Sequence, residues 1–212
     1  MPHLITCHSK TVGSIAAQHG WLVGARYTNL RDIKTFSEIG LIDIDWKNYD
    51  FEKHMWAVKK TKPLVTIARD LEDIEQSEEV FSQAAQLAKH AHNVCIVPKD
   101  LKLTGQVNSF VPEQFMLGYS TPTKYGGTQL PLTDFVNRPI HILGGRPDVQ
   151  RELASSLQIF SLDVNRFSLD ARFGDYFNGS RFVPHPIGGY LRCLEDSIKN
   201  ISSMWEVSDG RY

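Results

Sequence analysis

The feature that most constrains the fold is the regular return of short apolar runs, each closed by a polar or glycine-containing turn. Runs of this length are typical of strands that are buried on both faces. They lie at residues 4–7, 41–44, 64–68, 94–97, 115–118, 140–143 and 159–162. Between several of them, apolar residues recur every three or four positions, at residues 80–88, 149–157 and 191–205, and this spacing predicts helices.

Strands that alternate with helices predict parallel strands joined by right-handed crossovers. Alternation alone is compatible with a closed barrel or with an open doubly wound sheet. A length of 212 residues fits one domain, and no repeat, low-complexity tract or linker divides the chain. We predict a single α/β domain over residues 1–212, a small and irregular TIM-like (β/α) barrel. The stretches 101–112 and 121–139 lack helical spacing and are predicted to be long loops.

Composition narrows the classes of function. The formal net charge of −1 gives no global attraction to nucleic acid, although a local basic patch is allowed. No segment has the apolar length of a membrane helix and the N-terminus carries no export signal, so we expect a cytoplasmic protein without a membrane partner. Cys7, Cys95 and Cys193 are too few and too distant for a disulfide framework. The scattered histidines show no metal-ligand spacing, and we predict no metal and no cofactor.

Polar residues that close the apolar runs are the candidate functional residues, because parallel α/β folds bind ligands at the carboxyl ends of their strands. These residues are His8, Asp43, Asp45, Arg69, Asp70, Lys99, Tyr119, Ser120, Gly144, Gly145, Arg146, Asp163, Asn165 and Arg166. Any one of them would serve equally well as a helix cap or in a surface ion pair. Carboxylates that face one another across a barrel mouth, however, have their pKa values pushed apart, so that one acts as a base and another as a nucleophile.

Pairs of glycines mark three turns. Gly144-Gly145, just before Pro147, predicts a tight turn whose N–H groups can hold an anion, but the third glycine of a dinucleotide motif is missing. Gly188-Gly189, followed by Arg192, lies near the expected last strand, where barrels often bind phosphate, although a plain loop fits equally well. The third pair, Gly126-Gly127, lies in a long loop and directly follows Tyr125, whose ring we expect to be available for stacking on a base.

The stretch His141-Ile142-Leu143-Gly144-Gly145-Arg146-Pro147-Asp148, followed by Ile159-Phe160-Ser161-Leu162-Asp163, resembles the tRNA-guanine transglycosylase superfamily. Members of that superfamily are TIM barrels that exchange guanine for a deazaguanine base. The matching features are a strand, a glycine turn, a Pro-Asp helix start and a strand that carries the nucleophilic aspartate. Upstream segments resemble the family in the same order, at residues 41–43, 67–70 and 115–119.

The resemblance implies a role for each matching residue. Asp163 would attack the anomeric carbon of a nucleoside and form a covalent glycosyl-enzyme intermediate. Asp43, or Asp45 in its place, would carry the proton of the departing and incoming bases. The residues implied to bind the substrate are Asp70, Gly118, Tyr119, Gly144, Gly145 and Asn165.

Segments 25–32 and 173–177 also make the chain similar to uncharacterised proteins of phages and mobile elements, which resemble the branch of the superfamily that modifies DNA. The clustered cysteines and histidine that bind zinc in the tRNA enzymes are missing from this sequence. Pro98-Lys99 replaces a Gln-Gly pair, and Ile44-Asp45-Trp46 replaces a Ser-Gly-Gly motif. We therefore expect a base-exchanging glycosyltransferase that acts on DNA rather than tRNA, with a target in duplex DNA flipped out of the stack, together with a partner protein or a second copy of the chain.

Two alternatives remain open from the sequence. The first is a barrel enzyme that acts on a small phosphorylated metabolite, with Gly188, Gly189 and Arg192 holding the phosphate and the aspartates moving protons. The second is a non-catalytic protein that binds nucleic acid as an accessory factor. A covalent adduct on Asp163 distinguishes the transferase from both.

Overall fold

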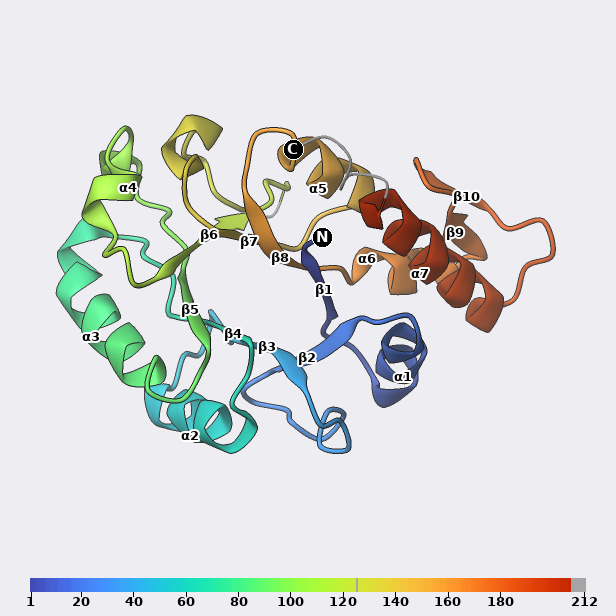
Figure 1. Cartoon of the computed structure of the whole chain (residues 1–212), viewed down its shortest axis with the longest axis horizontal. Coiled ribbons are helices and arrows are strands. Elements are labelled where there is room, and N and C mark those ends of the chain that lie inside the picture. Colours follow the sequence, from blue (N-terminus) through green and yellow to red (C-terminus); the bar gives the residue numbers. More distant parts are fainter. Residues whose placement is uncertain (125, 207–212) are drawn as a thin grey trace.

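The computed structural model describes residues 1–124 and 126–206, so the expectation for Tyr125 lies outside the described residues. Eight parallel strands follow one another around a closed barrel, in the order of the chain. Figure 1 shows the ring of strands with the helices outside it. The strands are β1 (His3–Thr6), β2 (Leu22–Arg26), β3 (Ile39–Asp43), β4 (Val65–Ile67), β5 (Asn93–Ile96), β6 (Met116–Ser120), β7 (Ile140–Leu143) and β8 (Ile159–Asp163). The predicted TIM-like barrel is confirmed, and the open doubly wound sheet is wrong.

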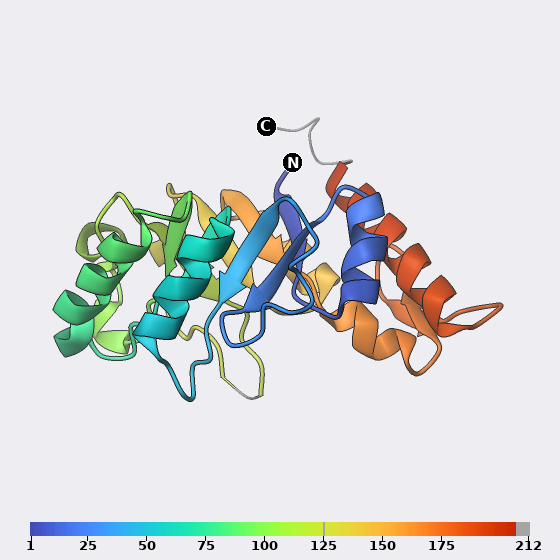
Figure 2. The ribbon, with the colours of Figure 1, turned by 90° about the horizontal axis from the view of Figure 1, so that it is seen from below.

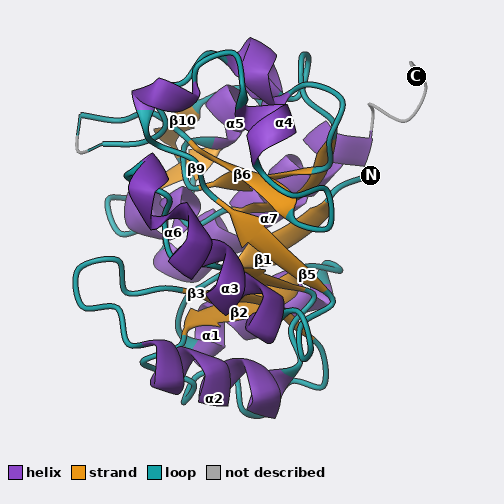
Figure 3. Cartoon of the chain, turned by 90° about the vertical axis from the view of Figure 1, so that its left-hand side faces the viewer, coloured by secondary structure: helices purple, strands orange, loops and turns teal. Residues whose placement is uncertain are grey.

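Helices cover the outside of the barrel (Figure 3). They are α1 (Lys10–Gln18), α2 (Phe51–Thr61), α3 (Ser77–Leu87), α4 (Val107–Phe110), α5 (Pro147–Leu153), α6 (Arg166–Ala171) and α7 (Tyr190–Glu206), with short 3-10 turns η1 (Ile74–Gln76), η2 (Leu101–Leu103) and η3 (Leu132–Phe135). The side chain of Asp50 caps α2 by accepting the backbone N–H of Lys53 at 3.1 Å. None of the helices in the described part of the chain is long and apolar enough to cross a bilayer.

Three expectations need correction. The prediction missed β2, because Gly24 breaks its apolar run; a Cβ at this glycine would lie 2.6 Å from the Cys7 Sγ atom, so the close approach of β1 and β2 requires glycine. The stretches predicted to be loops contain η2, α4 and η3. The strand β10 (Phe182–Pro184) pairs with β9 (Asp175–Phe177) outside the barrel, so the segment at residues 188–189 does not follow the last barrel strand.

The C-terminal helix α7 closes the side of the barrel next to β1. Of its apolar residues at the predicted helical spacing, Leu194, Ile198, Ile201 and Trp205 are buried, whereas Leu191 at the start of the helix is exposed. The helix packs on α1, α6 and β9. At the carboxyl ends of the strands, the described parts of the loops after β3 and β6 extend beyond the barrel on the same side (Figure 2). The fold therefore gathers these two loops and the strand ends at one mouth.

Candidate active site

The carboxyl ends of the strands surround a pocket of about 590 Å³, which we call the mouth pocket. Asp43, Asp70 and Asp163 all line it, so the structure brings together the three carboxylates that were expected to face one another. They come from β3, from the segment after β4 and from β8. Lys99, Arg26 and Trp46 line the same pocket.

Asp163 ends β8 with its carboxylate held between two donors. The backbone N–H of Gly144 donates to Oδ1 at 2.7 Å, and the Nδ2 group of Asn165 donates to Oδ2 at 2.7 Å. These two contacts fix the orientation of the carboxylate at the end of β8. Gly144 and Gly145 both have positive φ angles, of 62° and 96°, which is the conformation that favours glycine. The anion held by this predicted glycine turn is thus the chain's own Asp163.

The glycine turn is itself fixed by Gln150 of α5. The Nε2 group of Gln150 donates to the carbonyl oxygen of Gly144 at 2.7 Å and to that of Asp163 at 2.8 Å. A Cβ on Gly145 would lie 2.8 Å from the Thr121 Oγ1 atom, so only glycine allows the β7 turn to approach the end of β6 this closely. The position of the nucleophile candidate is therefore set by contacts from β6, β7 and α5.

A buried histidine lies beside Asp163 inside the barrel. His141 of β7 has no solvent exposure, its Nδ1 atom lies 2.7 Å from Ser161 Oγ, and its Nε2 atom lies 3.8 Å from Asp163 Oδ1. At 3.8 Å the Nε2 contact is electrostatic and too long for a hydrogen bond. His141 is not among the residues predicted to be functional; it lies within the apolar run at residues 140–143.

Asp43 ends β3 and is partly buried at the mouth. Burial raises its pKa to about 7, and the negative charge of Asp163 contributes further to the rise. The backbone N–H of Ile44, which donates to Asp43 Oδ1 at 2.8 Å, and the nearby cation Arg26 act in the opposite direction. At neutral pH Asp43 is present in both forms, so it can donate a proton and take one back.

Asp70 is paired with a lysine from the neighbouring strand connection. Burial raises the pKa of Asp70, while the Nζ group of Lys99, which donates to Oδ2, lowers it. The second carboxylate oxygen of Asp70 has no hydrogen bond to another residue of the described chain. Asp70 therefore offers an acceptor for N–H groups of a ligand.

Several predicted site residues do not line the mouth pocket. The side chain of Asp45 turns back to accept the backbone N–H of Lys47 at 3.3 Å, and of the two alternatives only Asp43 faces Asp163. A Cβ on Gly118 would lie 2.7 Å from Cys95 Sγ, so this glycine makes room for barrel side chains rather than for a ligand. Tyr119, its neighbour on the strand, packs its ring 5.1 Å from that of Phe135 outside the barrel, because successive residues alternate between the two faces of a strand.

The second predicted phosphate turn lies away from the mouth. Gly188 and Gly189 precede α7, and Nδ1 of His185 accepts the backbone N–H of Gly188 at 3.0 Å, while its Nε2 group donates to Asp196 at 2.9 Å. This turn is built around a histidine and shapes the entry to α7. Arg192 is exposed on that helix and lines none of the pockets described here.

A second chamber of about 530 Å³ adjoins the mouth pocket. The two cavities share Arg26, Asp43 and Asn165, so they are two parts of one cleft. We call this cavity the side chamber; it is also lined by His8 and by residues of the segment after β2. Arg26 was missed as a candidate together with β2, since a residue can be placed at a strand end only after the strand itself is recognised.

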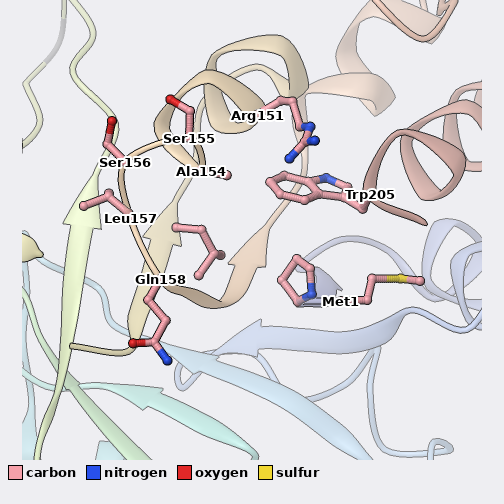
Figure 4. Close-up of a pocket in the computed structure, with 10 residues that line it drawn as sticks. Met1, Arg151, Ala154, Ser155, Ser156, Leu157, Gln158 and Trp205 are labelled. Atoms are coloured by element: carbon pink, nitrogen blue, oxygen red, sulfur yellow. The ribbon is translucent and has the colours of Figure 1, made fainter. Parts of the chain in front are cut away.

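The opposite end of the barrel holds a cavity of about 430 Å³ (Figure 4). Its wall includes Met1, Gln158 and Trp205, and the Arg151 guanidinium lies 5.3 Å from the centre of a Trp205 ring. No acidic side chain is among the described residues that line it. In barrel folds the functional residues lie at the carboxyl ends of the strands, which is the end where Asp43, Asp70 and Asp163 meet in this chain.

The described residues contain no group of three or more His, Cys, Asp or Glu side chains placed to hold a metal ion. No curated protein sequence matches the chain. A family model does match, over residues 16–206, which is nearly the whole described structure. The chain belongs to a family of unknown function, DUF6610.

Proposed function

We propose that the mouth pocket is the active site of a transferase that exchanges guanine for a deazaguanine base in nucleic acid, with DNA as the substrate. One observation carries the proposal: two carboxylates share the pocket, and their surroundings differ. Asp163 accepts hydrogen bonds from two donors that fix its orientation, whereas burial raises the pKa of Asp43 to about 7. Such a pair supplies a nucleophile and a proton carrier at neutral pH.

In the first step, an oxygen of Asp163 attacks the C1′ atom of the target nucleoside. The bond from C1′ to the base nitrogen breaks, its electron pair stays with the base, and Asp43 gives its proton to that base. The product is a glycosyl ester of Asp163, as in retaining glycoside chemistry.

In the second step, Asp43 takes a proton from the incoming deazaguanine. The deprotonated base nitrogen attacks C1′ and the ester bond to Asp163 breaks, which returns Asp163 as a carboxylate. Asp43 ends the cycle protonated, ready for the next departing base.

Recognition of the base falls to Asp70. Its carboxylate lines the mouth pocket, is fixed by Lys99 and can accept hydrogen bonds from the amino and imino N–H groups of guanine. The ordered likeness of the strand ends to the tRNA-guanine transglycosylase superfamily supports the same assignment. The cysteine and histidine cluster of the tRNA enzymes is missing from the sequence, which favours DNA.

The phosphorylated-metabolite alternative loses its main support, because Gly188, Gly189 and Arg192 lie outside both parts of the cleft. Because a net charge of −1 gives the chain no overall attraction to DNA, we expect a partner protein or a second copy of the chain to add affinity for DNA.

The test uses guanine-containing single-stranded DNA, duplex DNA and tRNA, each with a radiolabelled deazaguanine base. We expect label to enter a DNA strand, and a covalent protein–DNA adduct to survive denaturing electrophoresis. Asp163→Asn should abolish both signals, whereas Asp45→Asn, two residues from the proton carrier, should behave as the native chain. If Asp163→Asn still exchanges base at the native rate, or no substrate takes up label, the proposed function is wrong.

A further inference from the structure

The side chamber has no role in the chemistry described above. It opens beside Asp43, and Asn165, which holds Asp163, forms part of its wall. A ligand whose reacting carbon lies against Asp163 therefore has a second part within reach of this chamber. The chemistry of the chamber wall indicates what that part is.

Arg26 lies at the junction of the two cavities and lines both. It is the last residue of β2, and its guanidinium makes no hydrogen bond or ion pair with any other residue in the described part of the chain. A guanidinium presents planar pairs of N–H donors that match the oxygens of a phosphate. Arg26 therefore has its full donor capacity available for a ligand.

Charges of both signs surround the chamber, and the carboxylate of Asp43 is part of its wall beside Arg26. Asp32 lines the wall, but Arg31 lies 3.3 Å from its carboxylate and offsets its charge. His8 also lines the wall; burial and the positive charge of Arg172 lower its pKa, and the negative charge of Asp32 acts in the opposite direction, so a second cation, Arg172, lies near the chamber.

Polar backbone groups add to this field. Ser9 lines the chamber at the N-cap of α1, where no side chain caps the helix and the first turn carries no acidic residue. The free N–H groups of the first helical turn thus add partial positive charge on the same side as Arg26.

We propose that the side chamber binds a phosphate group of the nucleotide substrate, and that Arg26 is the residue that contacts it. The guanine base then occupies the mouth pocket and the sugar lies between the two cavities, against Asp163. This inference rests on the proposed function for the identity of the base, but the phosphate contact can be tested without any base exchange.

The experiment measures equilibrium binding to the full native chain of deoxyguanosine, deoxyguanosine 5′-monophosphate and a guanine-containing single-stranded oligonucleotide, without deazaguanine. We expect the phosphorylated ligands to bind at least about tenfold more tightly than deoxyguanosine. Arg26→Gln should remove that advantage, and Arg26→Lys should keep part of it. For the oligonucleotide, Arg26→Gln should also lower the slope of log affinity against log salt by about one.

The matched control is Arg151→Gln, which removes the same charge at the opposite end of the barrel and should leave all three affinities unchanged. If only the oligonucleotide binds more tightly than deoxyguanosine, the chamber binds a phosphate of a polynucleotide. If deoxyguanosine 5′-monophosphate also binds more tightly, the phosphate is one that a free nucleotide supplies as well. Equal affinity for deoxyguanosine and its phosphorylated forms, or native affinities in Arg26→Gln, would overturn the inference. If base exchange fails while Arg26→Gln still weakens phosphate binding, the proposed reaction is wrong and the phosphate site stands.

Discussion

The Nδ2 atom of Asn165 lies 2.7 Å from the Oδ2 atom of Asp163, and the far end of the same amide is fixed by β1. Its Oδ1 atom accepts the backbone N–H of Cys7 at 2.8 Å and the hydroxyl of Thr6 at 3.2 Å. An amide that accepts at its oxygen presents only donors at its nitrogen, so rotation of the group would break all three contacts. The seam between β1 and β8 thus orients the nucleophile candidate.

Asn165→Ala removes the donor to Asp163 and the acceptor of two groups at the end of β1, the Thr6 hydroxyl and the Cys7 N–H. We expect adduct formation to slow by about 10- to 100-fold and the free energy of unfolding to fall by roughly 1–2 kcal/mol. Single-turnover kinetics and chemical denaturation measure the two effects. The control is Asn178→Ala, which removes acceptors in the β9–β10 turn and should cost stability without slowing the adduct. A native adduct rate in Asn165→Ala contradicts the positioning role.

Asp43 makes the stability of the fold depend on pH. Its folded pKa of about 7 exceeds the ordinary value of 3.8, so between these pH values the folded state binds a proton that the unfolded state has lost. The free energy of unfolding is therefore highest below about pH 4 with respect to this group, and falls as the pH rises to about 7, by up to about 4 kcal/mol.

Asp43→Asn keeps an oxygen that can accept the Ile44 N–H but cannot ionise. We expect this variant to lose the decline and to be more stable than the native chain at pH 8. Denaturation curves at pH 5, 6, 7 and 8 give the comparison, with Asp45→Asn as the control that keeps the native pH dependence. An unchanged decline in Asp43→Asn would show that another group is responsible.

Lys99→Met leaves Asp70 buried without its ion-pair partner. Only 12% of the Asp70 side chain and 25% of the Lys99 side chain are exposed, so loss of one partner should cost about 2–3 kcal/mol of unfolding free energy at pH 7. The cost should shrink at lower pH, where Asp70 takes up a proton. Adding Asp70→Asn to the variant should restore most of the stability. A loss that persists in the double variant would place the effect in lost packing of the lysine stem.

Tyr27 ties the loop after β3 to β2. Its hydroxyl donates to the carbonyl oxygen of Asn48 and accepts the backbone N–H of Asp50, each at 2.9 Å. Tyr27→Phe should lower the unfolding free energy by roughly 1–2 kcal/mol and speed amide hydrogen exchange at residues 45–50. The control is Tyr190→Phe, on a ring more than a third exposed. If the amides of residues 45–50 exchange at the native rate in Tyr27→Phe, Tyr27 does not anchor the loop.

Asp43, Asp70 and Asp163 could be predicted to lie at one rim because buried parallel strands leave a local signal, a short apolar run. Asp43 lies near the end of one such run, and Asp70 and Asp163 come just after two others. The features that the sequence does not reveal depend on non-local packing. Gly24 interrupts the apolar run of β2, where the close approach of Cys7 requires a glycine, and Arg26 was therefore overlooked together with the strand.

The sequence also does not predict which residues of a strand point into the barrel. Whether Gly118 or Tyr119 faces inward depends on the parity of β6 against its neighbours, which closure of the barrel decides. The glycine turn at residues 188–189 was predicted to lie near the last barrel strand. The strand just before it, β10, instead pairs with β9 in a hairpin outside the barrel, which local sequence does not reveal.

Trp46 lies at the rim of the mouth pocket with 60% of its surface exposed, in the loop that Tyr27 anchors. An exposed aromatic ring at the edge of a base pocket is a stacking surface, and such stacking contributes about 1–3 kcal/mol per base. We expect Trp46→Ala to weaken oligonucleotide binding by about 5- to 100-fold while the melting temperature stays native. The chain offers a matched control: Trp56 on α2 is 56% exposed, and a lysine lies over its ring at 4.7 Å, as Lys47 lies over Trp46 at 5.1 Å. Trp56→Ala should bind the oligonucleotide with native affinity, because Trp56 lines none of the pockets described here. An equal loss of affinity in the two variants would indicate nonspecific binding to exposed aromatic rings and would contradict base stacking on Trp46.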